Sequence, residues 1–102
     1  MNIQFSYKQV AEKDKKFLED YIDKKISRLE TLIPTEEYEA SRLEIRSEKF
    51  AKKEAFKVEI FLSLPQTKFM ASEDDHTIIE AFDLALDKLL EQARRYNEKN
   101  KK

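Results

Sequence analysis

The sequence contains no glycine, no cysteine and no tryptophan, and only two prolines among its 102 residues. Without cysteine, the chain can form no disulfide bond, no thiolate nucleophile and no cysteine-ligated zinc or iron–sulfur site. Without glycine, it can contain no Walker A loop, dinucleotide-binding fingerprint or nucleophile elbow, because each of these motifs requires glycine. These absences exclude a disulfide-stapled secreted mini-protein and several large classes of enzyme.

Long hydrophobic runs are also absent. No apolar stretch approaches the ~18–20 residues that span a bilayer, and the first ten residues lack the basic and apolar segments of a signal peptide. We therefore expect a cytoplasmic protein with no membrane partner. Neither sign of charge dominates, since 20 Lys and Arg face 21 Asp and Glu. Apolar residues make up 40% of the chain, which is enough for one folded domain with a thin core.

Apolar residues alternate with polar ones in four segments, which is typical of half-buried strands. The strands are predicted at residues 2–10, 42–48, 56–64 and 69–71. Short connections join the last three, so we expect an antiparallel meander there. We expect the acidic residues Glu73, Asp74 and Asp75 to form a solvated turn that complements the positive end of the following helix.

Two segments repeat their apolar residues every three or four positions, which predicts amphipathic helices. The first runs over residues 14–33, with Asp14 as its N-cap and Pro34 as its stop signal. Its apolar stripe consists of Phe17, Leu18, Tyr21, Ile22, Ile26, Leu29 and Ile33. The second starts at Thr77, which forms a capping box with Glu80, and continues for about five turns.

The predicted order is β-α-β-β-β-α, an α+β fold. Two amphipathic helices and a four-stranded sheet with one apolar face pack most simply with both helices on that face. The other sheet face then stays in water. We expect residues 1–97 to form the single domain and residues 98–102 to be a polar tail that frays.

The sequence offers little for catalysis. The only histidine, His76, is expected to be exposed at the start of the last helix, and no Ser or Thr has an evident partner base. The neighbouring acidic residues could hold a divalent cation through oxygen atoms, but no EF-hand loop is present. We expect no enzyme activity, no metal, no cofactor and no small-molecule substrate.

Basic residues gather in two segments, residues 46–57 and 87–102, each with a net charge of +3. Acidic residues concentrate instead at residues 35–44 and 73–83. This distribution suits phosphate, because each neutralised phosphate releases counterions whatever the base sequence. In a chain this rich in charge, the same clusters can equally be ordinary solvated faces.

The chain also carries a distinctive series of residues through its third strand and last helix. The series consists of Leu64, Pro65, Ala71, Ala81, Asp83, Asp87, Lys88, Leu89, Gln92, Arg94, Arg95 and Tyr96. With Lys24, Lys25, Arg28, Leu29 and Glu30 on the first helix, it resembles the ribosome hibernation-promoting factors, also called ribosome-associated inhibitors or sigma-54 modulation proteins. The resemblance covers essentially the whole chain, although Glu91 stands where a basic residue is common.

The resemblance implies the same order of elements and a function in translation. The domain would lodge in the small ribosomal subunit where mRNA and the tRNA anticodon stems pass, and would block translation by occupancy. Its partners would be that subunit and its rRNA, recognised through phosphates and shape rather than base edges. The chain ends after the second helix, like the short members, so we expect no dimerisation domain of its own.

The resemblance and the charge pattern together predict the rRNA-binding residues. They are Lys24, Lys25 and Arg28 on the first helix, Lys88, Arg94, Arg95 and Lys99 on the last, and Arg46, Lys49 and Lys57 at the edge and face of the sheet.

Two alternatives remain open. A generic double-stranded RNA-binding module would carry a lysine cluster at the start of its second helix, where this chain has the acidic residues 73–75. A protein-interaction module would use the exposed sheet face, since Phe61 and Met70 are out of phase with the core. Steep salt dependence would favour RNA over a protein partner.

Overall fold

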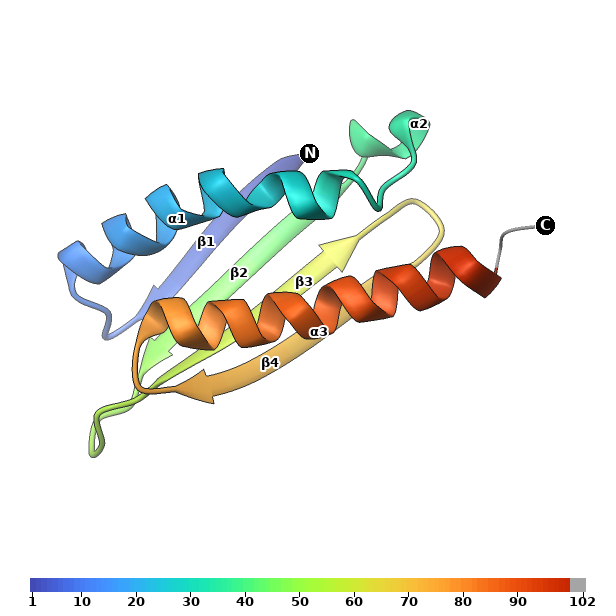
Figure 1. Cartoon of the computed structure of the whole chain (residues 1–102). Coiled ribbons are helices and arrows are strands. Elements are labelled where there is room, and N and C mark those ends of the chain that lie inside the picture. Colours follow the sequence, from blue (N-terminus) through green and yellow to red (C-terminus); the bar gives the residue numbers. More distant parts are fainter. Residues whose placement is uncertain (100–102) are drawn as a thin grey trace.

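Four strands form one mixed sheet in the order β1-β2-β3-β4 in the computed structural model, which describes residues 1–99 (Figure 1). The strands are β1 (Asn2–Lys8), β2 (Arg42–Lys49), β3 (Phe56–Ser63) and β4 (Lys68–Asp75). β1 pairs with β2 in parallel, while β2, β3 and β4 form the predicted antiparallel meander.

Two long helices lie side by side on one face of this sheet, as predicted (Figure 1). They are α1 (Glu12–Glu30) and α3 (Ile78–Lys99), and a short helix α2 (Thr35–Tyr38) lies between α1 and β2. The α+β fold is therefore confirmed, with α2 as an addition. The sequence analysis missed α2 because four residues are too few to show an apolar period.

The core lies between the sheet and the two helices. Phe5, Ile45, Ile60 and Ala71 are register partners in one row across the four strands, and all point to the helix side. In β3 every second residue from Phe56 onwards is buried, as its alternation predicted. Because only this face is covered, the opposite face of the sheet is open to water.

The first helix differs from its prediction at both ends. It begins at Glu12, and the backbone N–H of Asp14 already donates to the carbonyl of Ala11 at 3.0 Å, so Asp14 is not the N-cap. It ends at Glu30 rather than Ile33, because Leu32 and Ile33 donate to carbonyls three residues back, which tightens the last turn before the proline.

The predicted apolar stripe of α1 was wrong at Phe17, whose side chain is 60% exposed. Leu18, Ile22 and Leu29 of the same stripe are buried. Phe17 therefore lies at the edge of the apolar stripe, outside the sector of α1 that is packed into the core.

The acidic residues that were expected to form a turn belong to β4 instead. Glu73, Asp74 and Asp75 pair with Val58, Lys57 and Phe56 of β3. The hydrogen-bonding register of the neighbouring strand overrides their low strand propensity. Conversely, β1 ends at Lys8 rather than residue 10.

The start of α3 carries the hydroxyl half of the predicted capping box. The backbone N–H of Glu80 donates to Oγ1 of Thr77 at 3.1 Å. The carboxylate of Glu80 interacts with that of Asp75, which raises the pKa of Glu80. The backbone N–H of His76 lowers the pKa of Asp75, and His76 is exposed as expected.

The far end of α3 runs further than predicted. The helix continues through Lys99, so residues 98 and 99 of the expected polar tail are helical. The rest of that tail, residues 100–102, lies outside the described residues.

A side chain from α3 covers the free edge of the outer strand β4 at Met70. The backbone N–H of Met70 donates to Oε1 of Gln92 at 3.3 Å, and Nε2 of Gln92 donates to the Met70 carbonyl at 2.7 Å. The amide thus occupies the groups that another strand would use. Covering an edge in this way opposes pairing with a second chain.

The lack of glycine has one clear consequence, at the turn from β1 to α1. Gln9 has φ 58°, in the left-handed region that costs a residue with a side chain about 1–2 kcal/mol. Val is bulkier near the backbone than Gln, whereas Gly adopts this conformation freely. We expect Gln9→Gly to exceed Gln9→Val in free energy of unfolding by about 1–2 kcal/mol, measured by urea denaturation.

Gln4→Val, at an exposed position in the middle of β1, serves as the control and should change stability little. Equal stability of the two Gln9 variants would contradict the left-handed turn.

Candidate nucleic-acid interface

The predicted site residues do not form one patch. Six lie on the two helices: Lys24, Lys25, Arg28, Lys88, Arg94 and Arg95. Arg46 and Lys57 lie on β2 and β3 and face the open side of the sheet. Lys99 is the last residue of α3, and its side chain lies outside what the structure describes. One flat RNA surface could not contact both faces at once.

The structure brings Arg28 and Arg94 together across the groove between α1 and α3. They line a hollow with Ser27, Thr31, Leu32 and Leu90. Arg94 is exposed, and within residues 1–99 it has no hydrogen-bond or ion-pair partner. Lys24 lies one helical turn before Arg28 and is likewise exposed and unpaired in the described part of the chain.

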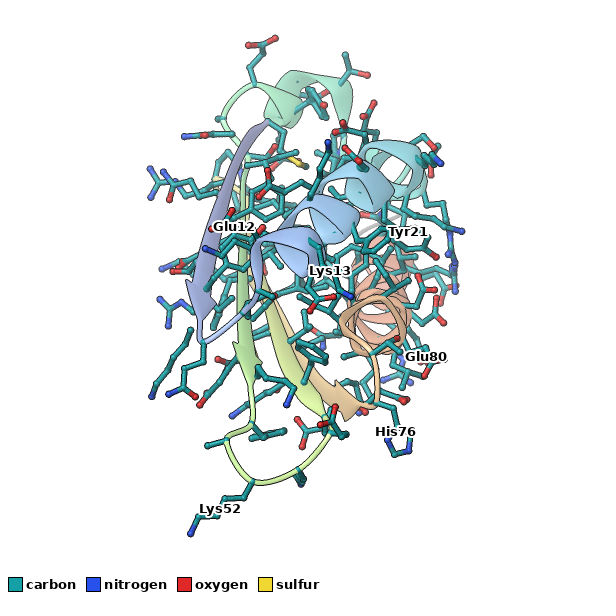
Figure 2. The ribbon with its side chains drawn as sticks, turned by 90° about the vertical axis from the view of Figure 1, so that its left-hand side faces the viewer. Glu12, Lys13, Tyr21, Lys52, His76 and Glu80 are labelled. Atoms are coloured by element: carbon teal, nitrogen blue, oxygen red, sulfur yellow. The ribbon has the colours of Figure 1, made fainter. Side chains whose placement is uncertain are left out.

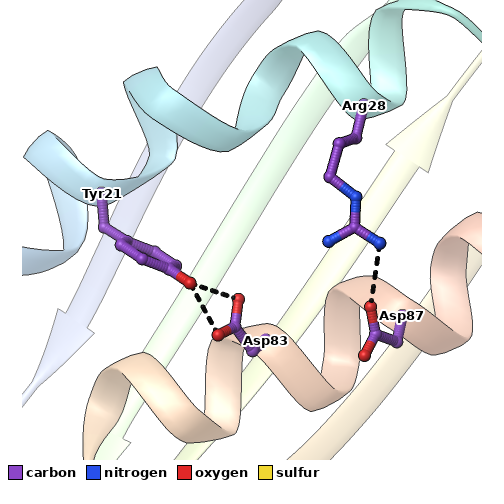
Figure 3. A network of polar contacts seen from close by, with 4 residues as sticks. All are labelled: Tyr21, Arg28, Asp83 and Asp87. Carbon is purple, nitrogen blue, oxygen red and sulfur yellow. Dashed lines mark hydrogen bonds and ion pairs between the residues drawn. The ribbon is translucent and has the colours of Figure 1, made fainter.

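Two polar contacts bridge α1 and α3 (Figure 3). The hydroxyl of Tyr21 lies 2.7 Å and 2.9 Å from the two carboxylate oxygens of Asp83. Nη2 of Arg28 lies 3.3 Å from Oδ1 of Asp87. The ammonium of Lys25 lies 5.3 Å from the centre of the Tyr21 ring. These contacts hold α1 and α3 at a defined spacing, so the width of the groove is set in the free protein.

Lys88 and Arg95 lie on the other side of α3, toward β4. Lys88 forms an ion pair with Glu73 of β4, and Arg95 pairs with Glu91 at 2.6 Å. Adjacent helical residues are turned by about 100°, so Arg94 and Arg95 face different directions. The sequence analysis predicted that both arginines bind rRNA, but only Arg94 lines the groove.

The open sheet face carries nearly balanced charge. Nε of Arg46 lies 2.7 Å from Oε2 of Glu44, and its guanidinium lies 4.8 Å from the centre of the Phe61 ring. Lys57 is placed between Glu48 and Asp74 by the strand register. Met70 on this face is 43% exposed, so the prediction that it is out of phase with the core is confirmed.

Lys49 faces away from the open sheet face and holds the loop between β2 and β3. Its Nζ lies 3.2 Å from the carbonyl oxygen of Phe50 and 3.3 Å from that of Lys53. The same ammonium lies 5.9 Å from the centre of the Phe56 ring. The Lys49 ammonium, which the sequence analysis predicted to bind rRNA, is thus in contact with carbonyl groups and a ring of the protein itself.

Two cations outside the predicted set project from that loop. Lys52 and Lys53 are exposed, and Figure 2 shows Lys52 at the tip of the loop, pointing away from the ribbon. They belong to the basic segment 46–57, but the loop has no periodicity from which their direction could be predicted.

The described residues hold no evident metal or membrane site. Within residues 1–99, no three His, Asp or Glu side chains are grouped to hold a metal ion. None of the helices in that range is long and apolar enough to cross a bilayer.

Comparison with known proteins gives a family match over nearly the whole chain. The family model described as sigma 54 modulation protein / S30EA ribosomal protein matches residues 3–101. The crystal structure of the Thermus thermophilus Protein Y N-terminal domain is 26% identical, with a TM-score of 0.75, and the match covers 94% of this chain and 99% of that one.

A ribosomal subunit interface protein from Coxiella burnetii shares the fold at 20% identity, with a TM-score of 0.72. The match covers 96% of this chain and 99% of that one. No curated protein matches the chain in sequence.

The bridge between Tyr21 and Asp83 makes a prediction about alkaline stability. Its hydrogen bond to the carboxylate raises the pKa of Tyr21 from 10.0 to about 12. A raised pKa favours the protonated folded state, so this contribution is complete below pH 10 and is lost as the pH rises toward about 12. We expect Tyr21→Phe to lower the free energy of unfolding at pH 7 by about 1 kcal/mol.

The same variant should show a smaller loss of stability between pH 10 and pH 12, measured by urea denaturation at each pH. Burial and Glu19 also raise the pKa of Tyr7, so some alkaline loss should persist. An alkaline profile identical to that of the parent would show that the bridge does not form.

Proposed function

The chain belongs to the sigma 54 modulation protein / S30EA ribosomal protein family, and on this basis we propose that it is a ribosome-associated hibernation factor. It binds the small ribosomal subunit in the channel for mRNA and tRNA, and blocks translation by occupying that channel. Blocking translation by occupancy requires no catalytic step. A protein with this role works in the cytoplasm.

The observation that carries this proposal is the basic groove between α1 and α3. Arg28 and Arg94 face each other across it, and Lys24 adds a third cation one turn away on α1. Phosphate groups bind such cations without regard to base sequence, which suits a domain that recognises rRNA by shape. The hydrogen bond between Tyr21 and Asp83 joins α1 to α3 before binding, which reduces the ordering cost of association.

The cations of α1 and α3 differ in how readily they can contact phosphate. Arg94 and Lys24 have no carboxylate partner within residues 1–99, so a phosphate can approach them directly. Arg28 must exchange Asp87 for phosphate, and Arg95 must exchange Glu91. These exposed pairs contribute little to stability, about 0–1 kcal/mol each, so the exchange costs little.

The open sheet face supports a second candidate function, a contact with protein. Met70 is exposed there beside Phe61, its register partner in β3. Such a contact would bury apolar surface and neutralise no RNA phosphates. Its affinity would therefore fall only slightly as the salt concentration rises.

Salt dependence separates these two functions. We expect the purified protein to cosediment with vacant bacterial small subunits, and its affinity to fall steeply between about 50 and 500 mM salt, because phosphate contacts release counterions. Cosedimentation with vacant large ribosomal subunits over the same salt range serves as the comparison. Binding that is insensitive to salt would favour the protein contact, and no binding at low salt would contradict ribosome association.

The groove itself is tested by removing its two unpaired cations. Lys24→Gln with Arg94→Gln should lower affinity for the small subunit on the order of tenfold at ~100 mM salt and reduce the salt slope by about two. Folding should be unaffected, since both positions are exposed.

The matched control is Arg42→Gln with Lys68→Gln, which removes two exposed cations from the sheet. Equal losses in both double variants would assign binding to net charge alone rather than to the groove.

A further inference from the structure

The loop between β2 and β3, residues 50–55, projects beyond the end of the sheet (Figure 1). It carries two of the exposed lysines of the chain, Lys52 and Lys53, and a single carboxylate, Glu54. It lies outside the helix groove, so a partner that fills the groove does not cover it by the same contact.

This loop is held in one conformation by contacts on several sides. The N–H of Phe50 donates to the Ala55 carbonyl at 3.0 Å, and the N–H of Ala55 donates to the Lys53 carbonyl at 2.9 Å. The ammonium of Lys49 contacts two loop carbonyls from behind. Nδ1 of His76 lies 3.3 Å from the carbonyl oxygen of Glu54. A loop ordered in this way presents its outward side chains at low entropic cost.

The two outward lysines are free of carboxylate partners. Lys52 has no polar partner in the described part of the chain, and it occupies the tip (Figure 2). The ammonium of Lys53 lies 4.7 Å from the centre of the Phe50 ring, a cation–π contact that involves no carboxylate. A phosphate can therefore bind either lysine without displacing a protein carboxylate, unlike at Arg28, Lys88 or Arg95.

We propose that the β2–β3 loop is a second phosphate-binding element, in which Lys52 and Lys53 contact the RNA backbone while Lys49 positions the loop. The proposal rests on the ribosome-binding function proposed above. It adds a contact at the end of the domain opposite to Arg28 and Arg94. The loop favours RNA over protein because Lys53 covers its one aromatic ring, Phe50, and leaves mainly charge at the tip.

The test is Lys52→Gln with Lys53→Gln, compared with the control Arg42→Gln with Lys68→Gln at the other end of the sheet. Binding is measured over a salt series to small ribosomal subunits and, separately, to a short RNA duplex. We expect the loop variant to reduce the salt slope by about two and the affinity on the order of tenfold at ~100 mM salt. The control should retain the parent slope.

Lys49→Gln distinguishes positioning from contact. If Lys49 only orders the loop, this variant lowers affinity but leaves the salt slope unchanged, because the number of phosphate contacts is the same. A slope reduced by about one would assign Lys49 to phosphate directly and overturn its positioning role.

Three outcomes overturn the loop proposal: unchanged binding in the Lys52 and Lys53 variant, an equal loss in the control, or weaker binding with an unchanged slope. The last would place a protein carboxylate rather than phosphate against the loop. Failure of the parent to bind the subunit while it binds the duplex would reject the proposed function alone, and the duplex series would still decide on the loop. Failure to bind either would overturn both.

Discussion

The structure depends on the burial of one face of its sheet beneath two helices. The central strand β3 places Val58, Ile60 and Leu62 fully out of water, and each side chain removed from water in this way contributes about 1.5–3 kcal/mol. A chain with this little apolar material can build only one such layer. Its 41 ionised side chains must therefore occupy the outer surface of the helices, the open face of the sheet or the connecting loops.

That constraint keeps cations on the surface of a chain whose net charge is −1. Several basic residues on the helices are paired with a nearby carboxylate, as Arg28 is with Asp87 and Lys88 with Glu73. Exposed cations without a carboxylate partner in the described part of the chain include Arg94 in the groove and Lys52 at the tip of the β2–β3 loop. Local arrangement, rather than total charge, decides where phosphate can bind.

Much of the fold could be predicted from the spacing of apolar residues along the sequence. The alternation in β3 and the capping Thr77 were correct because they depend on interactions between near neighbours in sequence. The length of β4 and the end of α1 were not predicted, since Glu73 becomes a strand residue only by pairing with β3. The position of Phe17 was wrong because a stripe read along the sequence does not show where the packed sector of a helix ends.

The fold class, the phase of each strand, the absence of cysteine and glycine chemistry, and the segments in which basic residues gather could all be predicted from the amino-acid sequence. These properties depend on residue type and local spacing. Which cations share a surface depends instead on how the elements pack against one another. The packing of α1 against α3 brings Arg28 to Arg94, the helical turn separates Arg94 from Arg95, and the backbone carbonyls of the loop occupy Lys49. These relations join atoms from distant or differently oriented parts of the chain, and no sequence period encodes them.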